Sequence, residues 1–318
     1  MIDFRYHLVS IISIFLALAV GIVLGAGPLQ QNLGTQLGDQ VSALRTEKQQ
    51  LNDQLSKAEK QVAAGDDYAT SVASRVVAGR LTGHRVAVIE MPSVESGLVD
   101  TVEAALRASG ARVTTSVTLT DDWFDPAKAP ERAAAAKEAA AALGLSSTAT
   151  GDALLHEVLA RALVTKAAGE AVQDPGSRKA ALTVLTSAKL VTSPKTGPTP
   201  ADVAVLASGE DFTGTRDAVD AESRSVRSLA LALSQSSAAT VVPGGDPVAA
   251  TGKVVTSDAV AAIRQGSATS ATISTVDHAR QGRGPAVVVL AIEAALEGTI
   301  GQYGVAEGAT AVMPEAAP

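Results

Sequence analysis

Few side chains in this sequence could bind a transition metal or act as a nucleophile. The 318 residues include no cysteine, which excludes disulfides, thiolate catalysis and cysteine-based metal sites. Transition metals with soft or intermediate ligand preference favour thiolate, thioether and imidazole ligands. The methionines and histidines are Met1, Met91, Met313, His7, His84, His156 and His278. No two histidines have the spacing of a ligand pair on one helix, so a metal site would need residues that the fold brings together.

Asp277 and His278 are the candidate metal ligands. They follow a predicted strand, and in parallel sheets ligands bind in crevices outside the carboxyl ends of the strands. Three further strand ends carry small or polar residues: Pro92–Ser93, Ser208–Glu210 and Gly244–Asp246. A ligand cleft needs such residues, but so do tight turns from a strand to a helix, and both interpretations stay open.

The motifs of common enzyme classes are absent. The stretch GGDPVAATGKVV resembles a phosphate loop, but Pro247 stands where the motif needs glycine and Val254 where it needs serine or threonine. No G-x-G-x-x-G follows a predicted strand, and no G-x-S-x-G elbow exists. We therefore expect no enzyme. The chain is also acidic, with 26 basic against 33 acidic residues, which argues against nucleic acid as a partner.

The apolar segment Leu8–Gly27 is twenty residues long and uncharged. As a helix it would span roughly 30 Å, the thickness of the hydrocarbon core of a bilayer. Signal peptides have shorter apolar cores, so we predict an uncleaved membrane anchor, with a signal peptide cleaved near LGAGPLQ as the alternative. Arg5 precedes the segment and the next basic side chain after His7 is Arg45. This charge bias places the N-terminus in the cytoplasm and the globular part outside it.

Two adjoining features predict a parallel homo-oligomer. Ala17, Gly21 and Gly25 recur every four residues, a small-residue ladder that lets two helices approach closely in lipid. A heptad pattern typical of a coiled coil follows. Its core positions are Leu37, Val41, Leu44, Lys48, Leu51, Leu55, Ala58 and Val62. The stripe is narrow for a helix that packs on its own domain, which is the alternative, and a polar core residue such as Lys48 tends to fix register and oligomer number.

Strand and helix patterns alternate from residue 84 onward. Strands are predicted over 84–91, 111–119, 201–209, 239–245 and 270–277, and helices over 96–110, 131–143, 152–168, 177–188, 216–236, 258–265 and 285–297. Five strands separated by helices indicate an α/β fold with a parallel sheet covered on both faces, Rossmann-like or flavodoxin-like. The expected parts are a transmembrane anchor (1–28), a coiled-coil stalk (29–65), a connector (66–83), a Rossmann-like domain (84–303) with a helical insert (121–200), and a flexible tail (304–318).

Two blocks of the chain resemble a known family. FRYHLVSIISIFLALAVGIVLGAGPL and the heptads behind it resemble the N-terminus of the actinobacterial copper transporter family typified by mycobacterial copper transport protein B. The block ISTVDHARQGRGPAVVVLAIEAALEGTIGQYG is similar to that family's closing strand, STVD turn, helix and YG element. The resemblance implies a membrane-associated copper-homeostasis protein, described as a channel for copper efflux across the outer membrane. Copper ion is then the candidate ligand, although the resemblance transfers no ligand residues.

Three functions compete at this point. The first is a membrane-anchored component of copper efflux in the cell envelope. The second is an oligomeric scaffold that presents an inert Rossmann-like domain to other envelope proteins. The third is an enzyme with unrecognised catalytic residues. A single apolar helix is not a barrel of many strands, and Ser10 and Ser13 are its only polar side chains within the apolar run, so the span by itself offers no evident ion path.

Overall fold

The computed structural model describes residues 4–26, 28–92, 94–166, 174–196, 200–209, 212–245, 255–280 and 282–315. The chain divides into two compact units, Met1–Ala64 and Gly65–Pro318. The first unit is helical throughout its described residues, and the second contains the β-sheets.

The first unit is formed by α1 (Phe4–Ala26) and most of α2 (Pro28–Val77). Proline suits the first position of α2, because the N–H that it lacks would have no partner within the helix there. The glycine at position 38 does not interrupt α2, which runs on past the expected end of the stalk. The connector expected over residues 66–83 is therefore helical as far as Val77.

The second unit is organised around a seven-stranded sheet with the order β3-β2-β1-β4-β6-β8-β9. The strands are β1 (Arg85–Glu90), β2 (Arg112–Leu119), β3 (Val191–Thr196), β4 (Val203–Ala207), β6 (Ala239–Pro243), β8 (Ser274–Val276) and β9 (Gln302–Tyr303). The five strands that were predicted, β1, β2, β4, β6 and β8, pair in parallel. Every residue of β4 and β6 is buried, as expected for central strands covered on both faces. The fold is thus mixed α/β with a mainly parallel sheet, as predicted.

Both edge strands of this sheet were missed by the sequence analysis. β3 lies in the TSPKTGPTP stretch that was expected to close the insert as a connection, and it pairs antiparallel with β2. β9 pairs in parallel with β8 and has only two residues. A strand that contains a proline, such as Pro194, or that is very short, is tolerated at a sheet edge, where one side of the backbone needs no partner.

Smaller differences from the prediction lie nearby. A second sheet of two antiparallel strands pairs β5 (Phe212–Gly214) with β7 (Val255–Ser257). The strand predicted over 270–277 is shorter than expected, because α9 (Ser267–Ser270) occupies its start. The strands β5 and β7 and the helix α9 are too short to show a clear hydrophobic period in the sequence.

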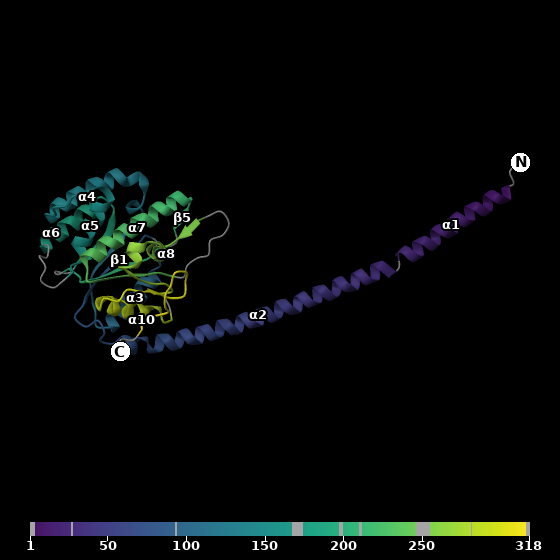
Figure 1. Ribbon diagram of the computed structural model, residues 1–318, viewed down its shortest axis with the longest axis horizontal. Helices are drawn as coiled ribbons and strands as arrows, with labels where there is room; N and C mark the ends of the chain where they lie inside the picture. The colour runs from purple at the N-terminus through teal and green to yellow at the C-terminus, as the bar shows by residue number, and fades with distance from the viewer. Residues whose placement is uncertain are drawn as a thin grey trace. The chain divides into compact units, whose positions relative to one another are not determined.

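One face of the large sheet is covered by α3 (Ser96–Ala108), α10 (Gly284–Leu296) and the end of α2. Figure 1 shows α3 and α10 together below the sheet. The strands contribute alternate valines to this core: Val86, Val88, Val203, Val205 and Val241. α10 is apolar on almost every side and eight of its residues are buried, which explains why it lies flat against the strands.

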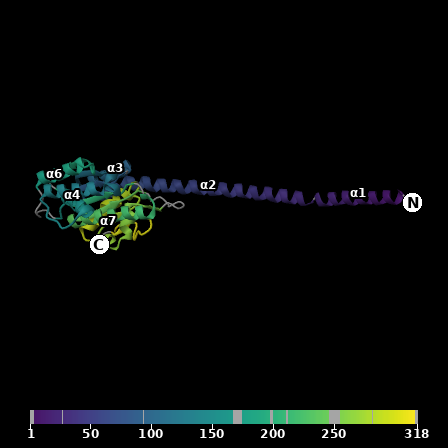
Figure 2. The same ribbon diagram turned by 90° about the horizontal axis from the view of Figure 1, so that it is seen from above.

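The opposite face carries a thicker helical layer, visible above the sheet in Figure 1. Its helices are α4 (Ala129–Leu143), α5 (Gly151–Leu163), α6 (Pro175–Ser187), α7 (Arg216–Ser236) and α8 (Ala259–Gln265). α4 and α6 lie side by side in both views (Figures 1 and 2) and contact each other closely. The buried alanines of α4 are small enough to allow this approach. The expected helical insert is therefore part of the main core.

A buried arginine holds the start of the insert. Arg132 of α4 is 4% exposed and forms a bidentate pair with Asp152, with N–O distances of 2.8 and 3.1 Å. It also donates to the carbonyls of Asp122 and Asp125, which belong to the short turns that precede α4. Trp123 in the first of these turns is buried, so it packs the insert.

The C-terminal segment differs from the flexible tail expected over residues 304–318. Gly304 donates to the carbonyl of Ala311 at 2.9 Å, and Thr310 donates to that of Gln302 at 2.7 Å. Tyr303 and Ala311 also form a parallel bridge. The described part of the segment, up to residue 315, thus folds back on β9, because these backbone groups find partners at the open sheet edge.

Candidate functional site

α1 carries the features of a membrane span. Phe4–Gly25 is the one helix among the described residues that is long and apolar enough to cross a membrane, with 22 residues and a mean hydropathy of 2.8. Its apolar side chains are exposed, and the Ser13 hydroxyl donates to the Val9 carbonyl at 2.8 Å, so this polar group is satisfied within the helix. At Gly21 and Gly25, apart from the adjoining residues and helix backbone, no atom lies within 4 Å of where a Cβ would be, which leaves room for close approach by another helix.

α2 presents an exposed apolar stripe at the predicted heptad positions. The large side chains of the stripe are between 45% and 64% exposed: Leu37, Val41, Leu44, Leu51, Leu55 and Val62. Soluble surfaces seldom leave so many large apolar side chains in a row in contact with water. The stripe is what one helix of a coiled coil offers to another.

Asp277 lies directly after β8 and is 3% exposed. Its Oδ1 accepts hydrogen bonds from the backbone N–H of Val305 at 2.9 Å and from His278, and its Oδ2 accepts one from the N–H of Ala306 at 3.1 Å. Arg264, itself buried, forms an ion pair with Oδ2 at 2.9 Å. Burial raises the pKa of Asp277, but these hydrogen bonds outweigh it and lower the pKa overall. The carboxylate thus ties the C-terminal segment to the end of β8.

His278 adjoins this carboxylate, with Nδ1 2.5 Å from Oδ1 of Asp277. Its backbone is in the left-handed region, with φ of 52°, which is uncommon for a residue other than glycine. Asp277 and His278 thus follow a strand directly, as predicted. Copper binding by this pair stays a prediction, and Asp277 would have to exchange hydrogen bonds for a metal bond.

The other histidines lie apart from this pair. His84 Nδ1 is 2.6 Å from Asp202 Oδ2 at the opposite, N-terminal end of the strands, whereas His156 is buried in α5. His7 is exposed on α1, and Met91 is buried after β1. In the ranges of the chain that the structure describes, no three histidine or carboxylate side chains gather as a metal site would require.

The crevice predicted at the carboxyl ends of the strands is closely packed where it is described. A Cβ at Gly209 would come within 2.1 Å of the Pro92 carbonyl, and one at Gly244 within 2.6 Å of Val260. The Ser208 hydroxyl accepts from the backbone N–H of Ala259. These glycines allow close packing between the ends of β1 and β4 and between the end of β6 and α8, which favours the turn interpretation. Ser93, Glu210 and Asp246, named in the prediction, lie outside the described residues.

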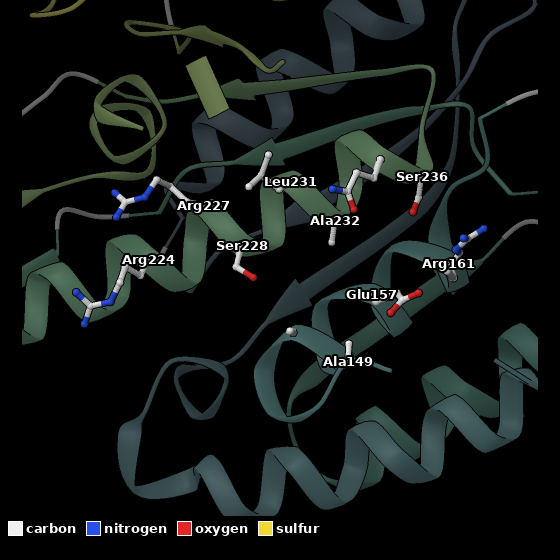
Figure 3. A pocket seen from close by; sticks show the side chains of 11 residues that line it. Ala149, Glu157, Arg161, Arg224, Arg227, Ser228, Leu231, Ala232 and Ser236 are labelled. Carbon is white, nitrogen blue, oxygen red and sulfur yellow. The ribbon is translucent and has the colours of Figure 1, made fainter. Parts of the chain in front are cut away.

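A cavity of about 490 Å³ lies instead between α5 and α7 (Figure 3). Three arginines line it, Arg161 from α5 and Arg224 and Arg227 from α7, together with Glu157. The hydroxyl of Ser228 also lines it and lies 2.9 Å from Nδ1 of the buried His156. Burial lowers the pKa of His156 to about 4, with a partly opposing effect of Asp152, so the imidazole is neutral at neutral pH.

Comparison with known proteins identifies the family. The profile of the family described as "Copper transport outer membrane protein, MctB" matches residues 1–314. The chain belongs to this family. Proteins named "Copper transporter MctB" from Mycobacterium tuberculosis (strain ATCC 25618 / H37Rv) and Mycobacterium bovis (strain ATCC BAA-935 / AF2122/97) are each 28% identical to it over 320 residues. The relative of that name from Mycobacterium leprae (strain TN) is 30% identical over 320 residues. Each comparison covers 98% of this chain and 99% of the relative.

The family resemblance drawn from the two terminal blocks is therefore confirmed. Other features of this MctB family member were not found from the sequence. Arg264, the ion-pair partner of Asp277, lies thirteen residues before it, on α8, so only the fold reveals the pair. The cavity between α5 and α7 was missed as well. The four-residue spacing of Glu157 and Arg161 on one helix face was the signal available, but an exposed helix surface shows the same spacing.

Proposed function

We propose that this protein is a membrane-anchored component of copper homeostasis that acts in copper efflux across the cell envelope. The observation that carries the proposal is the family match over residues 1–314, with relatives named copper transporters that align over almost their entire length. Copper is the transported species in this proposal, and we assign it no resident site.

The proposed anchor is the apolar segment over residues 8–27, which α1 covers as far as Ala26. A single-pass arrangement with a cytoplasmic N-terminus and an extracytoplasmic second unit is supported by the length of the helix and by Arg5 in front of it. A cleaved signal peptide is the competing assignment, and recovery of a mature protein that begins after Gly27 would favour it.

Self-association of the proposed anchor and stalk is the second element. The exposed stripe of α2 supports a parallel coiled coil, and the open space at Gly21 and Gly25 supports close packing of neighbouring anchors. Together they favour a homo-oligomer whose copies share one orientation. A channel along the axis of such an assembly is part of the proposal, since a single span has few polar groups of its own.

The second unit is proposed to be flavodoxin-like and catalytically inert. The five parallel strands follow the spatial order 2-1-3-4-5 when numbered among themselves along the chain, as in flavodoxin-like folds. The close packing at Gly209 and Gly244 supports a role other than catalysis at the usual crevice. An interaction domain that binds other envelope proteins is consistent with this, so an envelope scaffold is the second candidate function.

The first test is the copper content of cells that lack the gene. Accumulation of copper, reversed by the wild-type chain and not by a chain with Leu51→Asp, supports an oligomeric efflux component. Normal copper content together with an altered envelope supports the scaffold and contradicts the efflux proposal. A chain with Gln49→Asp is the matched control, since position 49 lies beside the stripe and outside the heptad core.

Direct copper binding is a separate question with its own experiment. Copper titration of the full chain in detergent, repeated with His278→Ala and His84→Ala, tests the candidate pair. Binding that is weakened by the first substitution and kept by the second supports a site at Asp277 and His278. Equal binding by both variants contradicts that site while leaving the efflux proposal to the cellular measurement.

A further inference from the structure

The cavity between α5 and α7 has the size of a ligand site. Its volume of about 490 Å³ falls within the range of small-molecule pockets, which runs from about 300 to 1,000 Å³. Figure 3 shows it bounded by the two neighbouring helices, with Arg224 and Arg227 towards one end and Arg161 towards the other. Both helices are packed into the main core, so the walls of the cavity are firmly held.

The charges that line the cavity are unbalanced. Three arginines face one carboxylate, and this carboxylate, Glu157, already accepts a hydrogen bond from the Ser147 hydroxyl at 2.5 Å. Within the described ranges, Arg161 and Arg224 have no ion pair, and Arg227 has only a long hydrogen bond of 3.4 Å to the Ala262 carbonyl. The cavity therefore presents guanidinium groups whose natural partner is an oxyanion.

A buried histidine orients a hydroxyl in the same cavity. His156 is 1% exposed, its Nδ1 lies 2.9 Å from Ser228 Oγ, and its Nε2 has no hydrogen-bond partner. Leaving a buried N–H at Nε2 without an acceptor costs more free energy than leaving an unprotonated Nε2 without a donor, so the proton is best placed on Nδ1. Nδ1–H then donates to Ser228 Oγ, and the hydroxyl hydrogen of Ser228 is left to donate into the cavity. Trp123, stacked on the imidazole at 5.8 Å, keeps the ring in place.

Most of the remaining lining is apolar, with Ala149, Ala153, Leu231 and Ala232 between the charged ends, and Gln235 and Ser236 are its other polar residues. We propose that this cavity binds a small organic oxyanion, with Arg224 and Arg227 around its charged group, Ser228 donating a hydrogen bond to it, and an apolar body against the alanines that lead towards Arg161. His156 is a positioning residue in this site. The proposal is independent of copper transport and of the membrane anchor.

Phenyl phosphate, which joins an apolar ring to a phosphate, is the first probe. Calorimetric titration of the full chain in an uncharged detergent is expected to show one molecule bound per chain. Inorganic phosphate should bind at least several-fold more weakly, because it leaves the apolar wall uncovered, and phenol should not bind, because it carries no charge. Benzoate distinguishes a carboxylate site from a phosphate site. Failure of both phenyl phosphate and benzoate to bind, or equal binding of phenol, would overturn the proposal.

Substitutions locate the binding site. Arg224→Gln is expected to weaken phenyl phosphate binding about tenfold, the effect of losing one charge-assisted hydrogen bond. The Arg224 side chain is exposed and has no described ion pair, so the variant should fold normally. Arg216→Gln is the matched control, since it removes the same charge from the start of α7 outside the cavity. Equal weakening by the control would show a nonspecific charge effect and refute the site.

The role of His156 needs a measurement that a packing defect would not mimic. His156→Phe keeps an aromatic ring beside Trp123 but removes the donor to Ser228. It should weaken phenyl phosphate binding several-fold in the wild-type chain and have no further effect in a chain with Ser228→Ala. Additive losses in the double variant would contradict the proposed relay from His156 to Ser228.

Discussion

Replacing Asp277 with asparagine removes one charge from a buried ion pair and leaves Arg264 behind. The arginine then loses its ion-pair partner, although its interaction with Asp258 and its bonds to Thr275 and to the carbonyls of Tyr303 and Glu307 remain. Breaking a buried pair in this way costs about 3–5 kcal/mol, and the remaining hydrogen bonds favour the lower end. For a unit of this size, about 3 kcal/mol corresponds to a fall of about 6–12 °C in Tm.

Thermal unfolding of the full chain without copper measures this loss. Hydrogen exchange should also become faster at the amides of Val305 and Ala306, whose acceptor is the Asp277 carboxylate. Asp220→Asn is the control, because Asp220 is exposed on α7 and should change stability by at most about 0.5 kcal/mol. A Tm of the Asp277→Asn chain within about 2 °C of the wild-type value would refute the reasoning, because loss of the ion pair should lower Tm by more than that.

The same substitution should alter the acid limb of the stability profile. Because the pKa of Asp277 is lowered in the folded protein, the unfolded chain binds more protons around its ordinary pKa. The stabilisation is therefore present above that ordinary value and is lost as the pH falls through the folded pKa. The Asp277→Asn chain lacks this titration and should show a flatter loss of stability in acid, as measured by denaturant unfolding at several pH values.

Four other outcomes are expected. Leu51→Asp should convert the proposed oligomer into monomers in light-scattering measurements, whereas Gln49→Asp should not. Lys48→Leu should raise the thermal stability of the assembly, since it replaces the polar residue in the heptad core. Gly21→Leu should weaken self-association of α1 in lipid vesicles, followed by energy transfer, because the side chain fills the open face. In the wild-type chain, the free energy of unfolding should rise by about 3 kcal/mol between pH 4 and 6.5, because there the unfolded chain binds a proton at His156 that the folded chain does not. His156→Phe should remove this rise. An unchanged dependence of the unfolding free energy on pH, measured by denaturant unfolding, would contradict this.

Much of the α/β framework could be predicted because its signals are local. Apolar runs such as VAVIE and VAVLA are short, β-branched and bounded by glycine or proline, and α7 has the predicted bounds, Arg216–Ser236. The edge strands could not be predicted in this way. β3 contains a proline and β9 has two residues, so both exist because a neighbouring strand offers unpaired backbone groups.

In the candidate sites, too, features with a local sequence signal could be predicted, whereas features that depend on packing between distant elements could not. Asp277 and His278 could be placed at a strand end from sequence, because that position follows from the alternation of strands and helices. Asp277 is held by Arg264 and by the backbone of the C-terminal segment. No sequence pattern indicates that these elements pack beside it. His156 and Ser228 are 72 residues apart, and each is an ordinary helix residue until α5 and α7 pack together.

The two edge strands of the large sheet affect how easily one molecule could pair with another through its sheet. A long bare strand would invite a neighbouring molecule to continue the ladder, and such growth has no natural end. Here one border is the proline-bearing β3, and the other is the two-residue β9, whose Tyr303 already bridges to Ala311. In the proposed oligomer, these borders would protect neighbouring copies from fibre-like polymerisation through their sheets.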